Sequence, residues 1–577
     1  MRLIIILLSL TLAACGGGGG GDTAALPVPP SDPTPPAPPE PAMSDAMASR
    51  FLTQATFGPT LPDINEVAQN GAETWFQEQL ALPASTHLET VLASFPDGEF
   101  RNENGQVLPQ AYLAPTNSFW QTAIEAPDQL RQRMAFALSQ ILVVSVDSNV
   151  GQFPHMLAGY MDLLTEGAFG NYRDLLESVT YSPAMALYLT YFRNQPADPV
   201  TGRVPDENYA RELLQLFTVG LVALNDDGTP VLDSEGQAIE LFDNDDITGL
   251  AKVFTGLSPA APFFFAPIRG LEDTAYYSPL EMFDSFHSME EKEFLGTTIS
   301  AGTDGVTSID LALDAIFDHP NVGPFVSRQL IQRFVTSHPE PEYVRRVAQA
   351  FDAGAYTLPS GDVVGAGLRG DLGATLAAVL FDENARDPAR AQQAAFGKIR
   401  EPVLRFTHWA RAFEVNNANA SNEPVLFNTG SAELLGQHPY GSPSVFNFYR
   451  PAYIAPGTET GDAGLTAPEL QISNATTIVG YPNVLTLFAF ELTPKVEDTV
   501  SSFIPDYVEA AALADEPEAL LDYLDLLLTY GELRDETRLR ITDAIEAVPL
   551  EADAAEYTRA RVASIMVMTA PEYVVQR

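Results

Sequence analysis

The sequence predicts a mainly α-helical protein, built as one large multi-helix domain with a small inserted β-hairpin and long loops. Apolar residues recur at spacings of three and four through most of residues 44–577, which is the period of an amphipathic helix. Hydrophobic residues make up 46% of the chain, so these helices can share a sizeable core. Between residues 221 and 242, Asp227-Gly228 and Glu235-Gly236 turns separate short apolar runs, a pattern typical of a hairpin.

Residues 1–14 have the pattern of a bacterial lipoprotein signal peptide. An apolar run leads to Leu12-Ala13-Ala14-Cys15, and Cys15 is the only cysteine of the chain. A lone cysteine at such a cleavage point accepts a diacylglycerol, so we predict that Cys15 is the lipidated first residue of an exported, membrane-anchored protein. Gly16 follows it in place of aspartate. By resemblance to proteobacterial sorting rules this favours the outer membrane, with the periplasmic and the surface face both open.

Residues 15–43 are interpreted as a Gly/Pro-rich tether. A glycine run spans residues 16–21 and a proline-rich stretch spans residues 27–41, and neither composition can bury a core. We therefore expect a folded body, residues 44–577, on a tether that is flexible at first and then semi-extended.

Capping residues and apolar periodicity predict where the helices of this body lie. Asp128 precedes a periodic run that continues to Val144, and Asp206 and Gly220 can cap a second helix at its start and its end. By the same pattern, further helices are predicted over Leu61–Leu80, His155–Thr180, Asp245–Phe254, Ser308–Phe317, Val322–Val335, Pro341–Phe351, Asp371–Phe381, Glu401–Phe413, Glu516–Thr529, Arg534–Ala547 and Ala554–Thr569. Long loops are expected over Pro259–Tyr277, Asn416–Ser431 and Tyr440–Pro468.

The charge of the chain argues against nucleic acid as a partner. Asp and Glu number 76 against 31 Lys and Arg, and the net charge of -45 repels phosphate backbones. After the signal, the most apolar stretch, Met134–Val146, is shorter than the ~20 residues that a membrane-spanning helix needs. No two of the seven histidines are four residues apart, so no helical zinc pair is predicted. No cofactor is evident from the sequence, and a divalent metal is left open.

The stretch Pro205–Gly220 contains the first group of candidate site residues. Glu207 and Arg211 lie one helical turn apart in the order that favours an ion pair, and Asn208 and Glu212 have the same spacing on the neighbouring stripe. Such residues beside an apolar face can line a cleft and exchange protons. They can also clamp the helix to its neighbours, and the sequence favours this structural role.

A second group lies in the stretch Phe283–Gly296. Asp284, His287 and Glu290 recur every three residues, which predicts that they stack on a short helical turn. A histidine with carboxylates can ligate a metal or exchange protons, although a simple hydrogen-bonded pair is the commoner case. Lys292 follows in the same stretch and joins the candidate site.

A third candidate is the loop Leu435–Pro451, which brings Gly, Pro, Ser and aromatic residues together around His438. Ser442 and Ser444 are close to this histidine in sequence, so one of them could be a nucleophile. A rigid, aromatic-lined loop is the simpler interpretation.

Nine stretches carry a resemblance to a known family. They are ASRFLTQATFGPT (Ala48–Thr60), LRQRMAFALSQILVVS (Leu130–Ser145), NYARELLQLFTVGL (Asn208–Leu221), ITGLAKVFTGLS (Ile247–Ser258), the H-x(4)-K-x-x-LG pattern from His287 to Gly296, DHPNVGPFVSRQLIQRFV (Asp318–Val335), KIREPVLRFTHWARAF (Lys398–Phe413), PSVFNFYRP (Pro443–Pro451) and APEYVVQR (Ala570–Arg577). Together they resemble the bacterial family called domain of unknown function 1800. The resemblance implies a single, mostly helical, exported protein. It also implies a partner, because relatives are often encoded beside a second family whose fold resembles that of sulfatases and alkaline phosphatases.

The sequence thus predicts an envelope lipoprotein that acts as a scaffold or partner-binding component of an envelope or secretion system. The alternative is a hydrolase of extracellular or envelope polymers. Its carboxylate and histidine site would draw on Glu207, Arg211, Glu212, His287 and Lys292, with or without a divalent metal. Convergence of these five side chains on one pocket would favour the hydrolase, and their separation into helix clamps would favour the scaffold.

Overall fold

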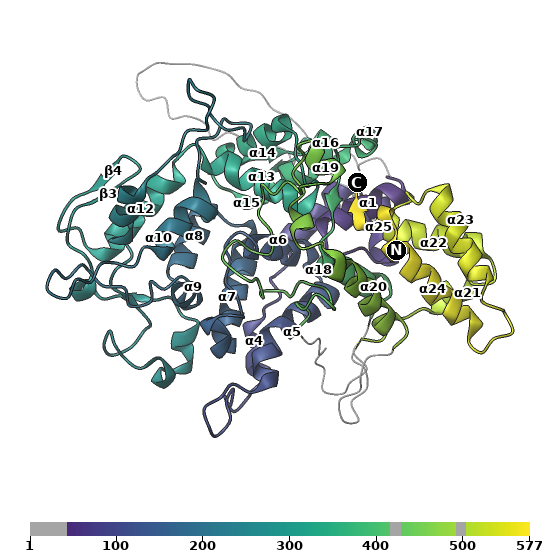
Figure 1. Cartoon of the computed structure of the whole chain (residues 1–577), viewed down its shortest axis with the longest axis horizontal. Helices are drawn as coiled ribbons and strands as arrows, with labels where there is room; N and C mark the ends of the chain where they lie inside the picture. Colours follow the sequence, from purple (N-terminus) through teal and green to yellow (C-terminus); the bar gives the residue numbers. More distant parts are fainter. Residues whose placement is uncertain (1–42, 416–427, 492–502) are drawn as a thin grey trace, which may run out of the picture. The chain divides into compact units, whose positions relative to one another are not determined.

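Helices carry most of the regular structure in the computed structural model, which describes residues 43–415, 428–491 and 503–577. The strands within these residues are two or three residues long and pair only in twos. The described residues form a single, mainly α-helical domain, so the predicted fold class is confirmed (Figure 1). The predicted signal peptide, Cys15 and most of the predicted tether lie outside the described residues.

The domain begins with three helices, α1 (Asp45–Ala55), α2 (Leu61–Asn70) and α3 (Ala72–Ala81). The periodicity predicts one helix over Leu61–Leu80, and the structure divides it at Gly71. This glycine has a φ of 88°, which ends one helix and starts the next. The apolar pattern continues across the break, and this explains why it conceals the boundary.

The middle of the domain is built around α6 (Gln129–Ser139), a helix that is almost entirely buried. It ends before the predicted Val144, and residues 140–146 continue as buried chain that leaves the helix through a last turn at residues 140–142. The predicted helix His155–Thr180 is divided by a turn at residues 167–171. The surrounding elements are α4 (Leu88–Ser94), α5 (Pro109–Glu125), η1 (Asn149–Gln152), α7 (Pro154–Glu166), η2 (Gly167–Phe169), α8 (Tyr172–Thr180) and α9 (Pro183–Tyr188).

A π-helix replaces the second half of the helix predicted between Asp206 and Gly220. The segment starts as α10 (Asn208–Glu212) and continues as η3 (Leu213–Thr218), in which the turns are wider. The amide of Val219 donates to the carbonyl of Leu214, five residues back, at 3.1 Å. Such π turns are rare and are frequent at functional sites, which draws attention to the surroundings of η3.

The hairpin predicted between residues 221 and 242 is present as tight turns joined by isolated bridges. These bridges pair Val222 with Glu240, Leu224 with Pro230 and Leu232 with Ala238, and no continuous strand forms there. Regular strands occur elsewhere as four antiparallel pairs: β1 (Leu257–Ser258) with β2 (Glu281–Met282), β3 (Lys292–Phe294) with β4 (Thr297–Ile299), β5 (Tyr356–Thr357) with β6 (Val363–Val364), and β7 (Lys398–Ile399) with β8 (Val575–Gln576).

The helical turn predicted to stack Asp284, His287 and Glu290 is wrong. Residues Asp284–Phe286 form one 3-10 turn, η6, after which the chain is extended and enters β3. Leu295 and Gly296 then adopt φ values of 46° and 72° in the turn to β4. This turn demands residues at positive φ, and its hairpin geometry outweighs the weak three-residue period.

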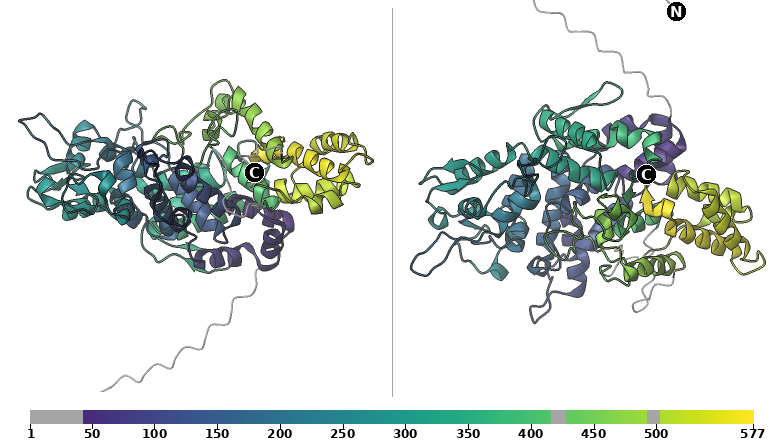
Figure 2. Two further views of the ribbon diagram at one scale, coloured as in Figure 1. Left: turned by 90° about the horizontal axis from the view of Figure 1, so that it is seen from below. Right: turned by 45° about the horizontal axis from the view of Figure 1, so that its top comes forward.

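The remaining predicted helices are found within a few residues of their expected ends. They are α11 (Asn244–Ala251), α12 (Gly305–Phe317), α13 (Val322–Phe334), α14 (Pro341–Ala353), α15 (Leu372–Phe381), α18 (Pro402–Ala412), α22 (Pro517–Thr529), α23 (Asp535–Glu546) and α24 (Ala555–Thr569). Figure 2 shows α22, α23 and α24 packed side by side. The shorter elements and the unpredicted α20 are η4 (Ile268–Gly270), η5 (Asp273–Tyr276), α16 (Glu383–Arg386), α17 (Pro388–Ala391), α19 (Glu459–Asp462), η7 (Pro468–Gln471), α20 (Ala475–Ala489), α21 (Val508–Ala512) and α25 (Pro571–Val574). Of the helices in the described ranges, none has both the length and the apolar character to cross a membrane.

Gly249 allows α11 to pack directly against β3, and we expect its replacement to lower the stability of the domain. A Cβ atom there would lie 1.8 Å from the carbonyl oxygen of Glu293, a backbone atom that cannot rotate away. Gly249→Ala should therefore destabilise the domain by about 3 kcal/mol, the upper end of the range for overpacking, as measured by urea denaturation. Gly270→Ala is the matched control, because a Cβ at Gly270 meets nothing within 4 Å. Equal stability of the two variants would contradict a rigid contact between α11 and β3.

Candidate functional site

A pocket of about 350 Å³ lies where four segments of the chain meet. Its walls come from η3 and the turn after it, from α13, from the end of α6 and from residues 445–452. The lining residues are Gln140, Ile141, Gln215, Leu216, Gly220, Leu221, Phe325, Gln329, Arg333, Val445, Phe446, Tyr449, Arg450, Pro451 and Ala452. Apolar walls with a few polar groups, in a cavity of this size, are typical of sites for small ligands.

Two backbone features shape this pocket. Gly220 has a φ of 76°, and a Cβ there would lie 2.9 Å from ring atoms of Phe325, so only glycine permits the close approach of this wall. In the loop, Asn447 has a φ of 62° and its amide donates to the carbonyl of Ser444 at 3.1 Å. The resulting turn leaves Tyr449 buried and the neighbouring Arg450 exposed.

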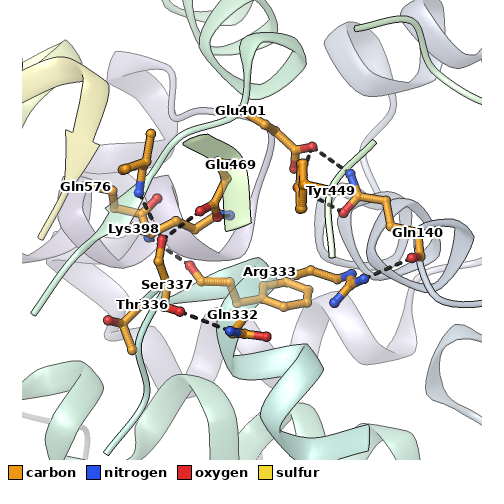
Figure 3. A network of polar contacts seen from close by, with 12 residues as sticks. Gln140, Gln332, Arg333, Thr336, Ser337, Lys398, Glu401, Tyr449, Glu469 and Gln576 are labelled. Atoms are coloured by element: carbon orange, nitrogen blue, oxygen red, sulfur yellow. Dashed lines mark hydrogen bonds and ion pairs between the residues drawn. The ribbon is translucent and has the colours of Figure 1, made fainter. Parts of the chain in front are cut away.

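Behind the pocket, the carboxylate of Glu401 accepts three hydrogen bonds at one oxygen. Its Oε2 accepts from Nε2 of Gln140 at 2.6 Å and from the hydroxyl of Tyr449 at 2.9 Å, as Figure 3 shows. The third donor is Nε2 of Gln437. Glu401 is fully buried at the start of α18, so one carboxylate joins α6, α18 and the loop that carries Tyr449. The three bonds to Oε2 fix the positions of their donors, whereas Oε1 is buried and has no hydrogen-bond partner among the described residues.

Two buried arginines lie near this carboxylate. Arg333 donates from Nη2 to the carbonyl of Gln140 at 2.9 Å and from Nη1 to the carbonyl of Gln329 at 3.0 Å. Arg133 donates to the carbonyl of Arg333, and its guanidinium lies 4.6 Å from the ring centre of Phe334. Burial lowers the pKa of Arg133 to about 10, with Glu401 acting in the opposite direction, and burial also lowers the pKa of Arg333. Both groups remain cationic at neutral pH.

A second buried cluster lies at the carboxyl end of α13. Lys398 donates to Oε1 of Glu469 at 2.6 Å, and the two side chains are only 1% and 2% exposed. Oε2 of Glu469 accepts from the hydroxyl of Ser337 at 2.8 Å. Gln332 donates to the carbonyl of Ser337, as Figure 3 shows. It also donates to the carbonyl of Pro451, so the cluster holds the pocket loop as well.

The predicted pair of Glu207 and Arg211 is confirmed as a partly exposed ion pair of 3.3 Å. Glu207 also accepts from the hydroxyl of Thr248 on α11 at 2.9 Å. The pair therefore clamps α10 to α11. Glu212 is buried, its Oε2 has no hydrogen-bond partner among the described residues, and burial raises its pKa while Arg211 opposes that rise.

His287 and Lys292 are buried in the segment that leads into β3, which packs against α11. Nδ1 of His287 lies 2.9 Å from the carbonyl oxygen of Thr255, so its partner is a backbone group and not one of the neighbouring carboxylates that the sequence suggested. Lys292 donates to the carbonyl of Glu290 at 3.3 Å, and burial lowers its pKa. Over residues 43–415, 428–491 and 503–577, no three His, Cys, Asp or Glu side chains are grouped so that they could hold a metal ion.

His438 and Ser444 have separate structural surroundings. His438 is buried, and its Nδ1 lies 3.3 Å from the amide nitrogen and 3.2 Å from the hydroxyl of Thr429. Ser444 is exposed, and its hydroxyl accepts from the amide of Phe446 at 3.3 Å within the turn of the loop. In the described part of the chain, no hydrogen bond joins His438 to Ser444.

His438 should make the stability of the domain depend on pH. Burial lowers its pKa from 6.5 to about 4. The unfolded chain therefore takes up this proton at a higher pH than the folded chain, so acidification through this window favours unfolding. We expect wild type to lose about 2 kcal/mol more than His438→Gln between about pH 7.5 and about pH 5, by urea denaturation at each pH. His338→Gln, at a less buried histidine, should alter the slope less, and identical slopes in all three proteins would contradict this assignment.

The five side chains predicted to carry a hydrolase site come from two segments that pack against α11, and they lie in separate interactions. Glu207, Arg211 and Glu212 come from α10, which packs on one part of α11, whereas His287 and Lys292 come from the segment around β3. The residues that line the pocket beside η3 include none of the five.

Sequence reasoning missed the residues that the structure does bring together at the pocket: Gln140, Arg333, Glu401 and Tyr449. Each is a polar residue within a stretch that is otherwise rich in buried apolar residues. The four stretches are also among those that carry the family resemblance, namely Leu130–Ser145, Asp318–Val335, Lys398–Phe413 and Pro443–Pro451. In the sequence, the signal that could have found them is a polar residue placed among apolar neighbours in these stretches.

The fold and this site define a mainly α-helical protein with a small pocket over a buried, charged polar network. The chain belongs to the family described as "Protein of unknown function (DUF1800)", whose model matches residues 50–575. The family resemblance seen in the sequence is thereby confirmed. No curated protein and no solved structure matches the chain.

Proposed function

We propose that this chain is an exported, lipid-anchored cell-envelope protein that works by binding, as a scaffold or partner-binding component of an envelope or secretion system. The pocket beside η3 carries the proposal. Most of its walls are apolar, and its buried polar lining residues, Gln140, Gln329, Arg333 and Tyr449, form what we call the polar floor. Hydrogen bonds to Glu401 hold Gln140 and Tyr449 of this floor in place. A preformed site of this kind binds with little cost for ordering side chains.

The position of the pocket in the family-like stretches supports this proposal. Leu130–Ser145, Asn208–Leu221, Asp318–Val335 and Pro443–Pro451 supply nearly all of its lining, and Lys398–Phe413 supplies Glu401 behind it. Five of the nine segments through which the chain resembles its family therefore meet at this pocket. The side chains proposed for hydrolysis lie elsewhere, around α11, which favours binding over the hydrolase alternative.

The proposed location in the outer membrane comes from the sequence. Leu12-Ala13-Ala14-Cys15 supports lipidation of Cys15, and Gly16 supports the outer membrane. The partner that the resemblance suggests is an envelope protein with a fold like that of sulfatases and alkaline phosphatases.

Photo-crosslinking in living cells tests the proposal at the rim of the pocket. A benzophenone amino acid at Ala452, an exposed lining residue, should give one discrete adduct with an envelope protein. The same group at Ala463, which is also exposed and does not line the pocket, is the matched control and should give none. Adducts of equal yield from both positions, or turnover of an envelope polymer by the purified protein, would contradict a binding role for the pocket.

The anchor is tested in the same cells with Cys15→Ser. We expect this variant to leave the membrane fraction and to lose the Ala452 adduct, because the lipid concentrates the protein beside its partner. Mass spectrometry of the mature amino terminus should find a diacylglycerol thioether in the wild type. An unmodified thiol there would contradict the proposed address.

A further inference from the structure

The pocket beside η3 is cationic in a strongly acidic protein. Arg333 and Arg450 are the charged side chains among its lining residues, and no Asp or Glu lines it within the described residues. By contrast, the cavity beside α7 and α8 is lined by Asp162, Glu166 and Asp174. In a chain with a net charge of -45, a lining with two arginines and neither Asp nor Glu makes this pocket a place where an anion meets attraction and not repulsion.

The buried charged groups around the polar floor also carry more positive than negative charge. Arg133 and Arg333 face a single nearby carboxylate, that of Glu401, because the charge of Glu469 is balanced by Lys398. One guanidinium charge thus remains uncompensated close to the pocket. A buried cation of this kind favours an anion within reach.

Two side chains of the floor retain unused donors. Arg333 and Gln329 are 3% and 5% exposed, and Nε of Arg333 and Nε2 of Gln329 have no hydrogen-bond partner among the described residues. At the rim, the guanidinium of Arg450 lies 4.7 Å from the ring centre of Phe446, which holds it beside the opening. The terminal torsion of a glutamine is soft, so Nε2 of Gln329 can turn toward a ligand.

We propose that this pocket binds the carboxylate of a small organic acid, with Arg450, Arg333 and Gln329 around the carboxylate. The short apolar chain of the acid lies against Leu216, Phe325 and Val445, which line the same pocket. A volume of about 350 Å³ accommodates an acid of several carbon atoms rather than a long lipid. The inference rests on the proposed function, because it names the ligand class of the same pocket, and it commits to a free acid.

Calorimetric titration of the full-chain lipoprotein in non-ionic detergent tests this inference with hexanoate as the probe. Hexanamide has the same chain without the charge. After subtraction of a titration of each probe into detergent alone, the difference between the two probes measures carboxylate recognition. We expect hexanoate to bind at least about tenfold more tightly than hexanamide. Equal affinities would overturn the inference.

Matched variants locate the binding. Arg450→Gln should weaken hexanoate binding about tenfold, whereas Arg540→Gln, which changes the net charge equally at a residue exposed on α23, should leave it unchanged. Ala452→Trp should block binding while the melting temperature stays that of the wild type. Equal affinities of Arg450→Gln and Arg540→Gln would overturn the assignment of the site.

A titration with a peptide distinguishes two possible ligands, a free acid and the carboxylate at the end of a polypeptide, which have the same chemistry. An acetylated tripeptide that ends in leucine should bind no better with a free carboxylate than with an amide. A peptide acid that binds more tightly than hexanoate would overturn the free-acid source and assign the pocket to the end of a partner chain. The titrations with purified protein need neither the membrane anchor nor a partner. If hexanoate binds but the crosslinker at Ala452 gives no adduct in cells, the proposed partner function is refuted and the ligand assignment is not.

Discussion

Replacing Lys398 by methionine should destabilise the domain by about 3–5 kcal/mol, because it leaves the carboxylate of Glu469 buried without its cation. The two groups are 2.6 Å apart and almost fully buried, so solvent cannot replace the lost partner. The hydroxyl of Ser337 would remain as a donor to Glu469, which is too little for a desolvated charge. Urea denaturation of wild type and variant measures the difference.

The double variant Lys398→Met with Glu469→Met is the control for this result. Removing both charges together avoids an unpaired buried ion, and methionine fills a similar volume. We expect the double variant to regain most of the stability that the single variant loses. A double variant as unstable as Lys398→Met would show that the cost comes from lost packing and not from the unpaired carboxylate.

Glu401→Leu should lower the free energy of unfolding by a similar amount, about 3–5 kcal/mol, for a different reason. The carboxylate accepts from Gln140, Gln437 and Tyr449, and it is the nearest counter-charge of two buried arginines. Leucine would strand three donors and add to the uncompensated positive charge. Because Gln140 and Tyr449 line the pocket, hexanoate binding should change together with stability.

Two milder variants separate these contributions in the same denaturation series. Tyr449→Phe removes one of the three donors, and we expect it to cost about 1 kcal/mol. Glu401→Gln keeps one acceptor oxygen in place and should fall between Tyr449→Phe and Glu401→Leu. If Glu401→Leu were no less stable than Tyr449→Phe, the arginines would not depend on this carboxylate.

Most helices could be predicted from the sequence, because their signals are local. Asp371 caps α15 with its side chain, and the predicted and observed helices there differ by one residue at the start. The predictions failed where backbone geometry overrides the apolar pattern. Gly71 breaks a continuous periodic run, and Leu295 with Gly296 makes a hairpin turn where a helical turn was expected. The π-helix η3 has the composition of an ordinary α-helix, so its wider turns could not be foreseen.

The candidate site was much less predictable, because its members meet only through tertiary packing. Gln140, Arg333, Glu401 and Tyr449 are separated by up to 309 residues in the chain, and no spacing rule connects them. The ion pair of Glu207 and Arg211 was predictable because it spans one helical turn. Attention therefore fell on acids and histidines with regular local spacing, whereas the polar residues at the pocket lie in stretches that look like ordinary core.

The pairing of β7 with β8 has a consequence for how a newly made chain reaches its final state. Val575 and Gln576 pair with Lys398 and Ile399, and Nε2 of Gln576 donates to the carbonyl of Phe334 at 2.7 Å, at the end of α13. Translation delivers this strand long after α13 has left the ribosome. The pairing of β7 with β8 and the bond from Gln576 to α13 can therefore form only after residues 575 and 576 have been synthesised, which makes them late steps of folding.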